Sequence, residues 1–128
     1  MHHVKVASVP ILIAVLFSGC SNSIETACTQ EFRPGLIVYV NDSLTNTPGA
    51  SGASLVARDG SFKDSVAYPS GRPDLDASPL YSAGERPGTY QITVTKTGNL
   101  PWSMNNVRVT ANQCHVNQVT LTARLVPQ

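Results

Sequence analysis

Residues 89–96 carry the clearest pattern of the chain, a strict alternation of polar and apolar side chains. Tyr90, Ile92 and Val94 are separated by threonine and glutamine. Because successive side chains of a strand point to opposite faces, this period of two predicts a strand with one buried face. The segment 36–40 is a continuous run of β-forming residues, and it predicts a second strand.

Turn-forming residues divide the rest of the chain into further short segments. Nine glycines and nine prolines are scattered between these segments, and Asp59-Gly60 is a strong hairpin signal. Residues 68–80 are expected to form a loop or irregular edge, because proline cannot donate to a ladder. The sequence therefore predicts an all-β fold, a single antiparallel β-sandwich of about seven strands. The predicted strands are 36–40, 53–58, 61–67, 80–83, 89–96, 107–110 and 115–125.

The N-terminal region contains an apolar run, residues 6–17, that follows Lys5. The last residue of the run begins the tetrapeptide Phe-Ser-Gly-Cys, which ends at Cys20. A positive start, an apolar stretch of about 7–15 residues and small residues before the cut are typical of a signal peptide. The run is shorter than the stretch of about 20 apolar residues that spans a membrane. This segment resembles a bacterial lipoprotein signal with its lipobox, although Phe17 stands where leucine is usual.

The resemblance to a lipobox implies an address for the protein. Residues 1–19 are the expected signal peptide, 20–27 a lipidated tether and 28–128 the folded domain. An acylated (palmitate-type) Cys20 would hold the protein at the cell envelope. Ser21 is not the aspartate that often retains lipoproteins at the inner membrane, so the outer membrane facing the periplasm is expected in a Gram-negative cell. Secretion with a free Cys20 and an uncleaved anchor remain alternatives.

Charge and cysteine content narrow the class of protein. Charged residues make up 13% of the chain and the formal net charge is +1, which leaves no basic patch for nucleic acid and no polybasic segment for anionic lipid. If Cys20 carries lipid, Cys28 and Cys114 permit one pairing, and exported compartments sustain disulfides. The alternative is two buried free thiols. A metal site is not expected, because His115 is the only histidine beyond the signal segment.

Several segments between Pro34 and Leu125 match a known domain pattern. They are the strand Gly35 to Val40, the connection Thr47-Pro48-Gly49 with Gly52-Ala53, the hairpin Ala57 to Phe62, the segment Glu85 to Val94 with Lys96-Thr97-Gly98, and the endings Val107 to Val109 and Val119 to Leu121. The chain thus resembles the carboxypeptidase regulatory-like domain, an immunoglobulin-like, transthyretin-type β-sandwich. The resemblance implies a non-catalytic module that acts beside a partner.

The candidate catalytic and metal-binding groups are few. Acid–base and nucleophilic sites usually combine a histidine with a nucleophile and a third group, and His115 is adjacent to a predicted disulfide cysteine. We therefore expect no enzyme activity and no cofactor. Asp74 and Asp76, with Asp64, suggest Ca²⁺ only weakly, because that ion takes six to eight oxygen ligands, and a solvated loop is the simpler interpretation.

Aromatic residues are the remaining candidates for ligand contact. Trp102 follows a proline in a predicted turn, while Tyr68 and Tyr81 bound the long loop. Exposed aromatic rings can stack on sugars or fill a partner's pocket, whereas a lone tryptophan often caps the core. We predict a lipid-anchored, non-catalytic binding or structural module with an envelope protein as partner. The alternative is carbohydrate or peptidoglycan binding through these three residues. The neighbouring charges Glu31, Arg33, Glu85 and Arg86 are expected to form surface pairs or to fix loops.

Overall fold

A computed structural model describes Gly19 and residues 26–128. Cys20, the predicted signal peptide except Gly19, and most of the predicted tether lie outside the described residues. The described chain forms eight strands and one short 3₁₀ turn, Pro73–Leu75. The strands are β1 (Pro34–Asp42), β2 (Ala53–Asp59), β3 (Phe62–Ala67), β4 (Leu80–Gly84), β5 (Gly88–Lys96), β6 (Trp102–Ala111), β7 (Val116–Asn117) and β8 (Val119–Leu125). Within the described part, no helix is long and apolar enough to cross a membrane.

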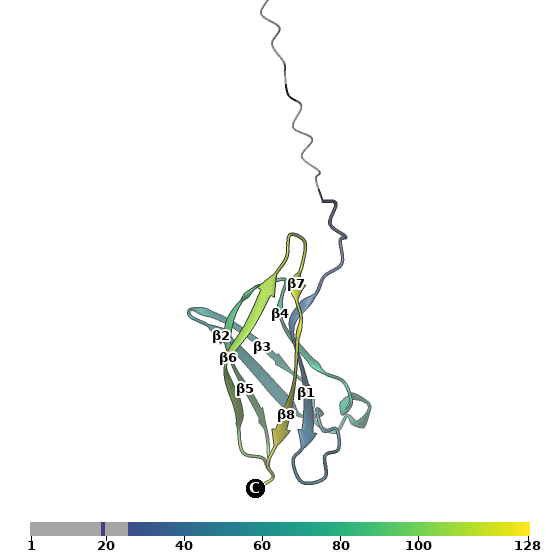
Figure 1. Ribbon diagram of the computed structural model, residues 1–128. Coiled ribbons are helices and arrows are strands. Elements are labelled where there is room, and N and C mark those ends of the chain that lie inside the picture. The colour runs from purple at the N-terminus through teal and green to yellow at the C-terminus, as the bar shows by residue number, and fades with distance from the viewer. Residues whose placement is uncertain (1–18, 20–25) are drawn as a thin grey trace, which may run out of the picture.

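The strands form two sheets that pack face to face, so the all-β sandwich predicted from the pattern is confirmed (Figure 1). One sheet has the order β4-β1-β8 and the other the order β3-β2-β5-β6-β7. All pairs are antiparallel except β1 with β8, which run parallel from Leu36 opposite Val119 to Asp42 opposite Leu125. Two parallel neighbours need a long connection between them. The six strands between β1 and β8 provide it, since these two are the first and last strands.

The core lies between the two sheets and follows the alternation of each strand. On β5, Tyr90, Ile92 and Val94 are fully buried, as the alternation predicts. On β1, Leu36, Val38 and Val40 are buried, whereas the residues between them face outward. Burying a side chain of this size stabilises the fold by roughly 1.5–3 kcal/mol. The core therefore consists of single faces of strands, although segment 36–40 is apolar throughout.

Two strands differ from their predicted bounds. β6 begins at Trp102, five residues before the predicted strand, so Trp102 lies on a strand and not in a turn. The predicted strand 115–125 is interrupted at Gln118 and gives two strands. Its first part, β7, pairs with β6, and its second part, β8, pairs with β1. The chain thus passes from one sheet to the other at Gln118, which no local pattern encodes.

Candidate binding face

The outer face of the three-stranded sheet carries exposed aromatic residues. Because Leu36 and Val38 point into the core, Ile37 and Tyr39 on β1 point outward. Tyr81 on β4 lies directly opposite Ile37 in the strand register. The exposed fraction is 40% for Tyr39 and 52% for Tyr81. Both tyrosines are therefore partly exposed to water on the outer side of this sheet.

Phe32 extends this face at the end where β1 begins. It is 72% exposed, and its ring lies over Gly84 so closely that a Cβ at that position would overlap it. Phe32, Ile37 and Tyr81 border a shallow depression of about 430 Å³, with Gln118 at its margin. We call the set Phe32, Ile37, Tyr39 and Tyr81 the aromatic face. It gathers four apolar side chains on one side of the domain, and such patches mark sites of interaction.

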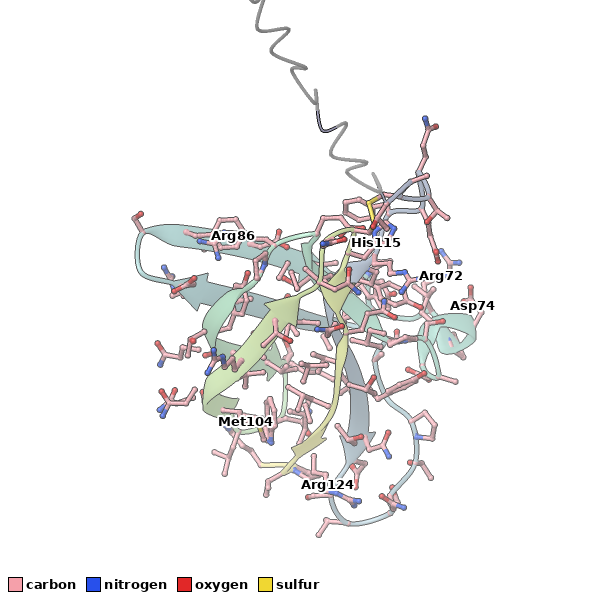
Figure 2. All side chains as sticks on the ribbon, turned by 45° about the horizontal axis from the view of Figure 1, so that its top comes forward. Arg72, Asp74, Arg86, Met104, His115 and Arg124 are labelled. Carbon is pink, nitrogen blue, oxygen red and sulfur yellow. A yellow bond between two sulfur atoms is a disulfide. The ribbon has the colours of Figure 1, made fainter. Side chains whose placement is uncertain are left out.

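Hydroxyl groups from β8 border the aromatic face. Thr120 is opposite Ile37 in the register, and Thr122 is opposite Tyr39. Both threonines are exposed, so they point outward beside the aromatic residues. Farther along the pair, Arg124 donates from Nη1 to the Asn46 side chain at 2.7 Å, and Figure 2 shows it at the end of the molecule opposite His115. The aromatic face thus combines ring surfaces with hydrogen-bonding groups along one edge.

The structure separates the three aromatic residues that the sequence nominated. Tyr81 belongs to the aromatic face. Tyr68 packs against the core and donates from its hydroxyl to the Pro79 carbonyl oxygen at 2.7 Å, and burial together with the nearby Tyr81 raises the pKa of its phenol. Trp102 lies opposite the buried Val94 and packs against the core. Tyr68 and Trp102 therefore contribute mainly to packing in this structure.

Sequence reasoning did not nominate Phe32 or Tyr39. Tyr39 lies inside a run of β-forming residues, so the pattern alone does not show which alternate positions face water. Phe32 precedes the predicted first strand and carries no motif. The alternation of a strand could have identified Tyr39. Once one face of β1 is known to be buried, the alternation puts Ile37 and Tyr39 together on the other face.

The predicted disulfide is present at the end of the domain where the N-terminal segment leaves it. Cys28 and Cys114 are bonded, with 5.2 Å between their Cα atoms, and 86 positions separate them in the sequence. Figure 2 shows the sulfur–sulfur bond beside His115. The bond fastens the segment before β1 to the loop between β6 and β7.

His115 takes part in a chain of hydrogen bonds beside this disulfide. Its Nδ1 lies 2.7 Å from Glu85 Oε1, and its Nε2 lies 3.0 Å from Thr29 Oγ1. The two Glu85 oxygens also accept the backbone N–H groups of Arg33 and Val116. These hydrogen bonds, led by the one from His115, lower the pKa of the Glu85 carboxyl although partial burial opposes them.

The hydroxyl, imidazole and carboxylate follow the order of groups in a hydrolase triad. Sequence reasoning found no third group for His115, because Glu85 is 30 positions away. The partners of Glu85 lie in the segment before β1, in β7 and in the loop that precedes it, so the carboxylate joins separate parts of the backbone. The absence of enzyme activity stays a prediction.

The carboxylates of the long loop have separate partners. Asp74 pairs with Arg72, and Figure 2 shows the two side chains at the edge of the molecule. Asp76 Oδ1 accepts the Ser51 N–H at 3.0 Å, whereas Asp64 accepts hydrogen bonds from β4. Within residues 26–128, no three groups of metal-ligating type lie together. The three aspartates therefore stabilise local structure independently of one another.

Two charged groups match the expected local roles. Arg33 pairs with Glu31 at 2.9 Å, and Arg86 pairs with Asp59 at 2.9 Å while its guanidinium lies 4.0 Å from the Phe62 ring centre.

No protein-family model matches this chain, and no curated protein matches it. We therefore infer the function from the residues of the site itself.

Proposed function

We propose that this protein is a lipid-anchored, non-catalytic binding module of the cell envelope, and that the aromatic face is its binding surface. The observation that carries the proposal is the exposure of Tyr39 and Tyr81 on the outer side of a sheet whose inner side forms the core. The lipobox-like segment ending in Cys20 supports the anchor. The resemblance to the carboxypeptidase regulatory-like domain supports a role beside a partner.

Tyrosine is well suited to a binding surface. Its ring buries a large area at the cost of few rotatable bonds, and its hydroxyl keeps a hydrogen bond when the ring is covered. Tyrosine is also enriched among the residues that dominate binding energies. Contact with Tyr39, Tyr81 and Phe32 would remove apolar surface from water, and this removal is the main driving force for association.

The position of the aromatic face suits a tethered module. Phe32 comes two residues before β1, in the segment that the Cys28–Cys114 bond fastens. β1 runs away from the end of the domain where the N-terminal segment joins it (Figure 1). Tyr39 is five positions after Pro34 along the strand, a distance of about 17 Å. The surface thus extends outward from the attachment point, so a tethered domain presents it to a partner in the envelope.

Carbohydrate binding is the second candidate. Stacking of sugar rings on Tyr39 and Tyr81, with hydrogen bonds from Thr120 and Thr122, is the chemistry that a flat aromatic surface bordered by hydroxyl groups provides. Because Trp102 packs against the core, we propose Tyr39 in its place as a sugar-contacting residue. Tyr81 remains a proposed sugar-contacting residue.

A double variant, Tyr39→Ala with Tyr81→Ala, tests the binding surface. We expect it to lose at least tenfold in retention on peptidoglycan sacculi, or in crosslinking to an envelope protein, while circular dichroism shows the same fold. Leu44→Ala is the matched control, because Leu44 is 79% exposed in the turn after β1 and is not part of the aromatic face. Equal binding by the double variant and the wild type would refute the role of the aromatic face.

The anchor has a separate test in the intact mass of the native protein extracted with detergent. We expect a chain that begins at Cys20 and carries acyl mass, with two thiols that react only after reduction. Cys20→Ala should move the protein from the membrane to the soluble fraction. An unlipidated chain would refute the anchor and leave the binding face to be judged on its own test.

A further inference from the structure

The outer face of the five-stranded sheet differs in chemistry from the aromatic face. Its outward positions on β5 hold threonine and glutamine, and those on β6 hold serine, asparagine, arginine and threonine. The cations on this side are Arg58, Lys63 and Arg108. Within the described chain, none of the outward positions of β2, β3, β5 and β6 carries a carboxylate.

The strand register places cations and amides in one row across four strands. Lys63 on β3 is opposite Arg58 on β2, and Arg58 is opposite Gln91 on β5. Gln91 in turn faces Asn105 and Asn106 on β6. We call these five residues the cation–amide row. Neighbouring strands are about 4.8 Å apart, so the row spans about 14 Å, the size of a short oligosaccharide.

The positive charges in the row have no ion-pair partner among the described residues. Like charges directly opposite each other on a sheet are destabilising, yet Arg58 and Lys63 occupy such a pair. None of the ion pairs formed within the described residues includes either side chain. One carboxylate, Asp59, borders the same depression but is paired with Arg86 at 2.9 Å. The row therefore retains two cations that an anionic ligand would satisfy.

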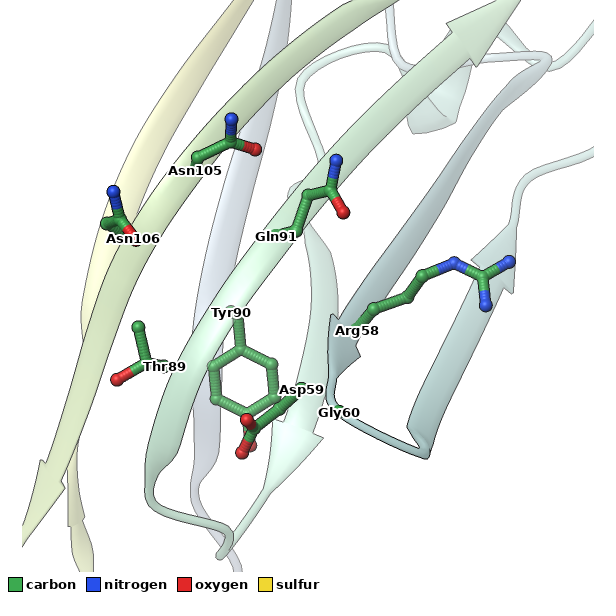
Figure 3. Close-up of a pocket in the computed structure, with 8 residues that line it drawn as sticks. All are labelled: Arg58, Asp59, Gly60, Thr89, Tyr90, Gln91, Asn105 and Asn106. Carbon is green, nitrogen blue, oxygen red and sulfur yellow. The ribbon is translucent and has the colours of Figure 1, made fainter.

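A β-bulge shapes the amide end of the row. Asn105 and Asn106 together occupy the place opposite Gln91, and Asn106 has a φ of 56°. Bulges redirect side chains and occur often near functional sites. Figure 3 shows Gln91 between Arg58 on one side and the two asparagines on the other. These residues border an open depression of about 450 Å³.

We propose that the cation–amide row binds a saccharide that carries carboxylate groups. The Arg58 guanidinium matches a carboxylate with two parallel hydrogen bonds, and Lys63 adds a second positive charge beside it. Gln91, Asn105 and Asn106 each offer donors and an acceptor, which pair with the hydroxyl groups of a sugar. This site lies on the opposite sheet from the aromatic face and does not depend on it.

The chemistry of the row favours a carboxylated sugar over other anions. Nucleic acid needs many phosphate contacts, because neutralised phosphates supply most of its affinity, and the row has two cations. A membrane surface is contacted through clustered basic residues, each worth about 1 kcal/mol near the surface. The three adjacent amides suit the ring hydroxyls beside a uronic carboxylate.

Titration with a short oligogalacturonate, followed by amide NMR shifts and calorimetry, tests this proposal. We expect saturable binding with shifts at Arg58, Gln91, Asn105 and Asn106, and an affinity that falls as salt rises. Arg58→Gln should weaken binding at least tenfold. Asn106→Gly keeps a residue that tolerates positive φ and removes the side chain with its amide, so it should weaken binding without changing the fold.

Arg124→Gln is the matched control, because Arg124 lies on the other sheet and its loss should leave the affinity unchanged. Neutral cello-oligosaccharide should bind at least tenfold more weakly than oligogalacturonate. Absence of binding, or equal affinity in Arg58→Gln, would overturn the proposal. Binding to phosphatidylglycerol vesicles without binding to oligogalacturonate would also overturn it, in favour of a lipid headgroup.

Discussion

At the scale of single residues, Tyr90 connects the core to the loop before its own strand. Its side chain is fully buried, and its hydroxyl donates to the Arg86 carbonyl oxygen at 2.8 Å while it accepts from Arg86 Nη1 at 3.0 Å. The ring also meets Phe62 edge to face, with 6.2 Å between centres. A buried tyrosine needs such a partner for its hydroxyl.

Tyr90→Phe should lower the free energy of unfolding by about 1–3 kcal/mol, because it leaves the Arg86 carbonyl without its donor. Urea unfolding measures this change. Tyr39→Phe makes the same chemical change on the exposed face and should stay within about 0.5 kcal/mol of the wild type. Equal effects of the two variants would show that the Tyr90 hydroxyl has no structural role.

Substitution of two glycines by alanine tests how closely neighbouring groups approach the backbone at these positions. A Cβ at Gly35 would lie 2.8 Å from the Ala83 carbonyl oxygen, which cannot move independently of β4. Gly35→Ala should therefore destabilise the fold by about 1–3 kcal/mol in urea unfolding. At Gly84 the added methyl group would meet the exposed Phe32 ring, which can rotate away. A Gly84→Ala variant as unstable as Gly35→Ala would contradict this distinction.

At the scale of elements, Asp64 fastens β3 of one sheet to β4 of the other. Its Oδ2 accepts from Ser82 Oγ at 2.8 Å and from the Ala83 N–H at 2.9 Å. The hydrogen bond from Ala83, above all, holds the pKa of the Asp64 carboxyl below its ordinary value, although partial burial opposes this shift. The contact closes one side of the sandwich without a shared ladder.

The Asp64 contact makes stability depend on pH. Because the folded state lowers the pKa, the added stability is fully present above the unfolded value of about 3.9 and is lost as pH falls through the folded value. Asp64→Asn should therefore be less stable than the wild type at neutral pH, and the difference should shrink below about pH 4. Thermal unfolding across this pH range measures it.

Asp74→Asn is the control for Asp64, because Asp74 forms an exposed pair with Arg72. Exposed ion pairs contribute about 0–1 kcal/mol. A difference between wild type and Asp64→Asn that stays constant down to acid pH would contradict the assignment.

At the scale of the whole molecule, the Cys28–Cys114 bond constrains the unfolded chain more than it shapes the sandwich. It closes a loop of nearly the whole domain, with 86 positions between the cysteines. Replacing both cysteines by serine should lower the free energy of unfolding by about 2–5 kcal/mol in urea. The two sheets should remain, because their ladders do not include Cys28 or Cys114.

Amide exchange distinguishes the two roles of the bond. In the Cys28→Ser, Cys114→Ser variant, residues 29–33 should lose protection while β1 keeps it, because the bond fastens only the segment before β1. Loss of protection throughout β1 and β8 would instead show that the disulfide holds the sandwich together.

The local sequence pattern predicted some of the strands and candidate binding residues but not others. The alternation on β5 predicted its buried face, and the hairpin signal Asp59-Gly60 predicted the turn between β2 and β3. Tyr81 was nominated as a contact residue and lies on the aromatic face. Tyr39 was not predicted to be a contact residue, because an unbroken apolar run does not show which of its side chains face water. Trp102 was assigned to a turn because Pro101 precedes it, but the ladder with Val94 extends β6 to that residue.

By itself, the sequence determined the all-β class, most strand positions, the disulfide partners and the lipobox-like motif, because each depends on neighbouring residues or on counting. Tertiary structure alone decided the parallel pairing of β1 with β8, the change of sheet at Gln118 and the bulge opposite Gln91. It also brought Glu85 to His115. These features depend on residues distant in the chain, since a strand's pattern fixes its two faces but not its neighbours.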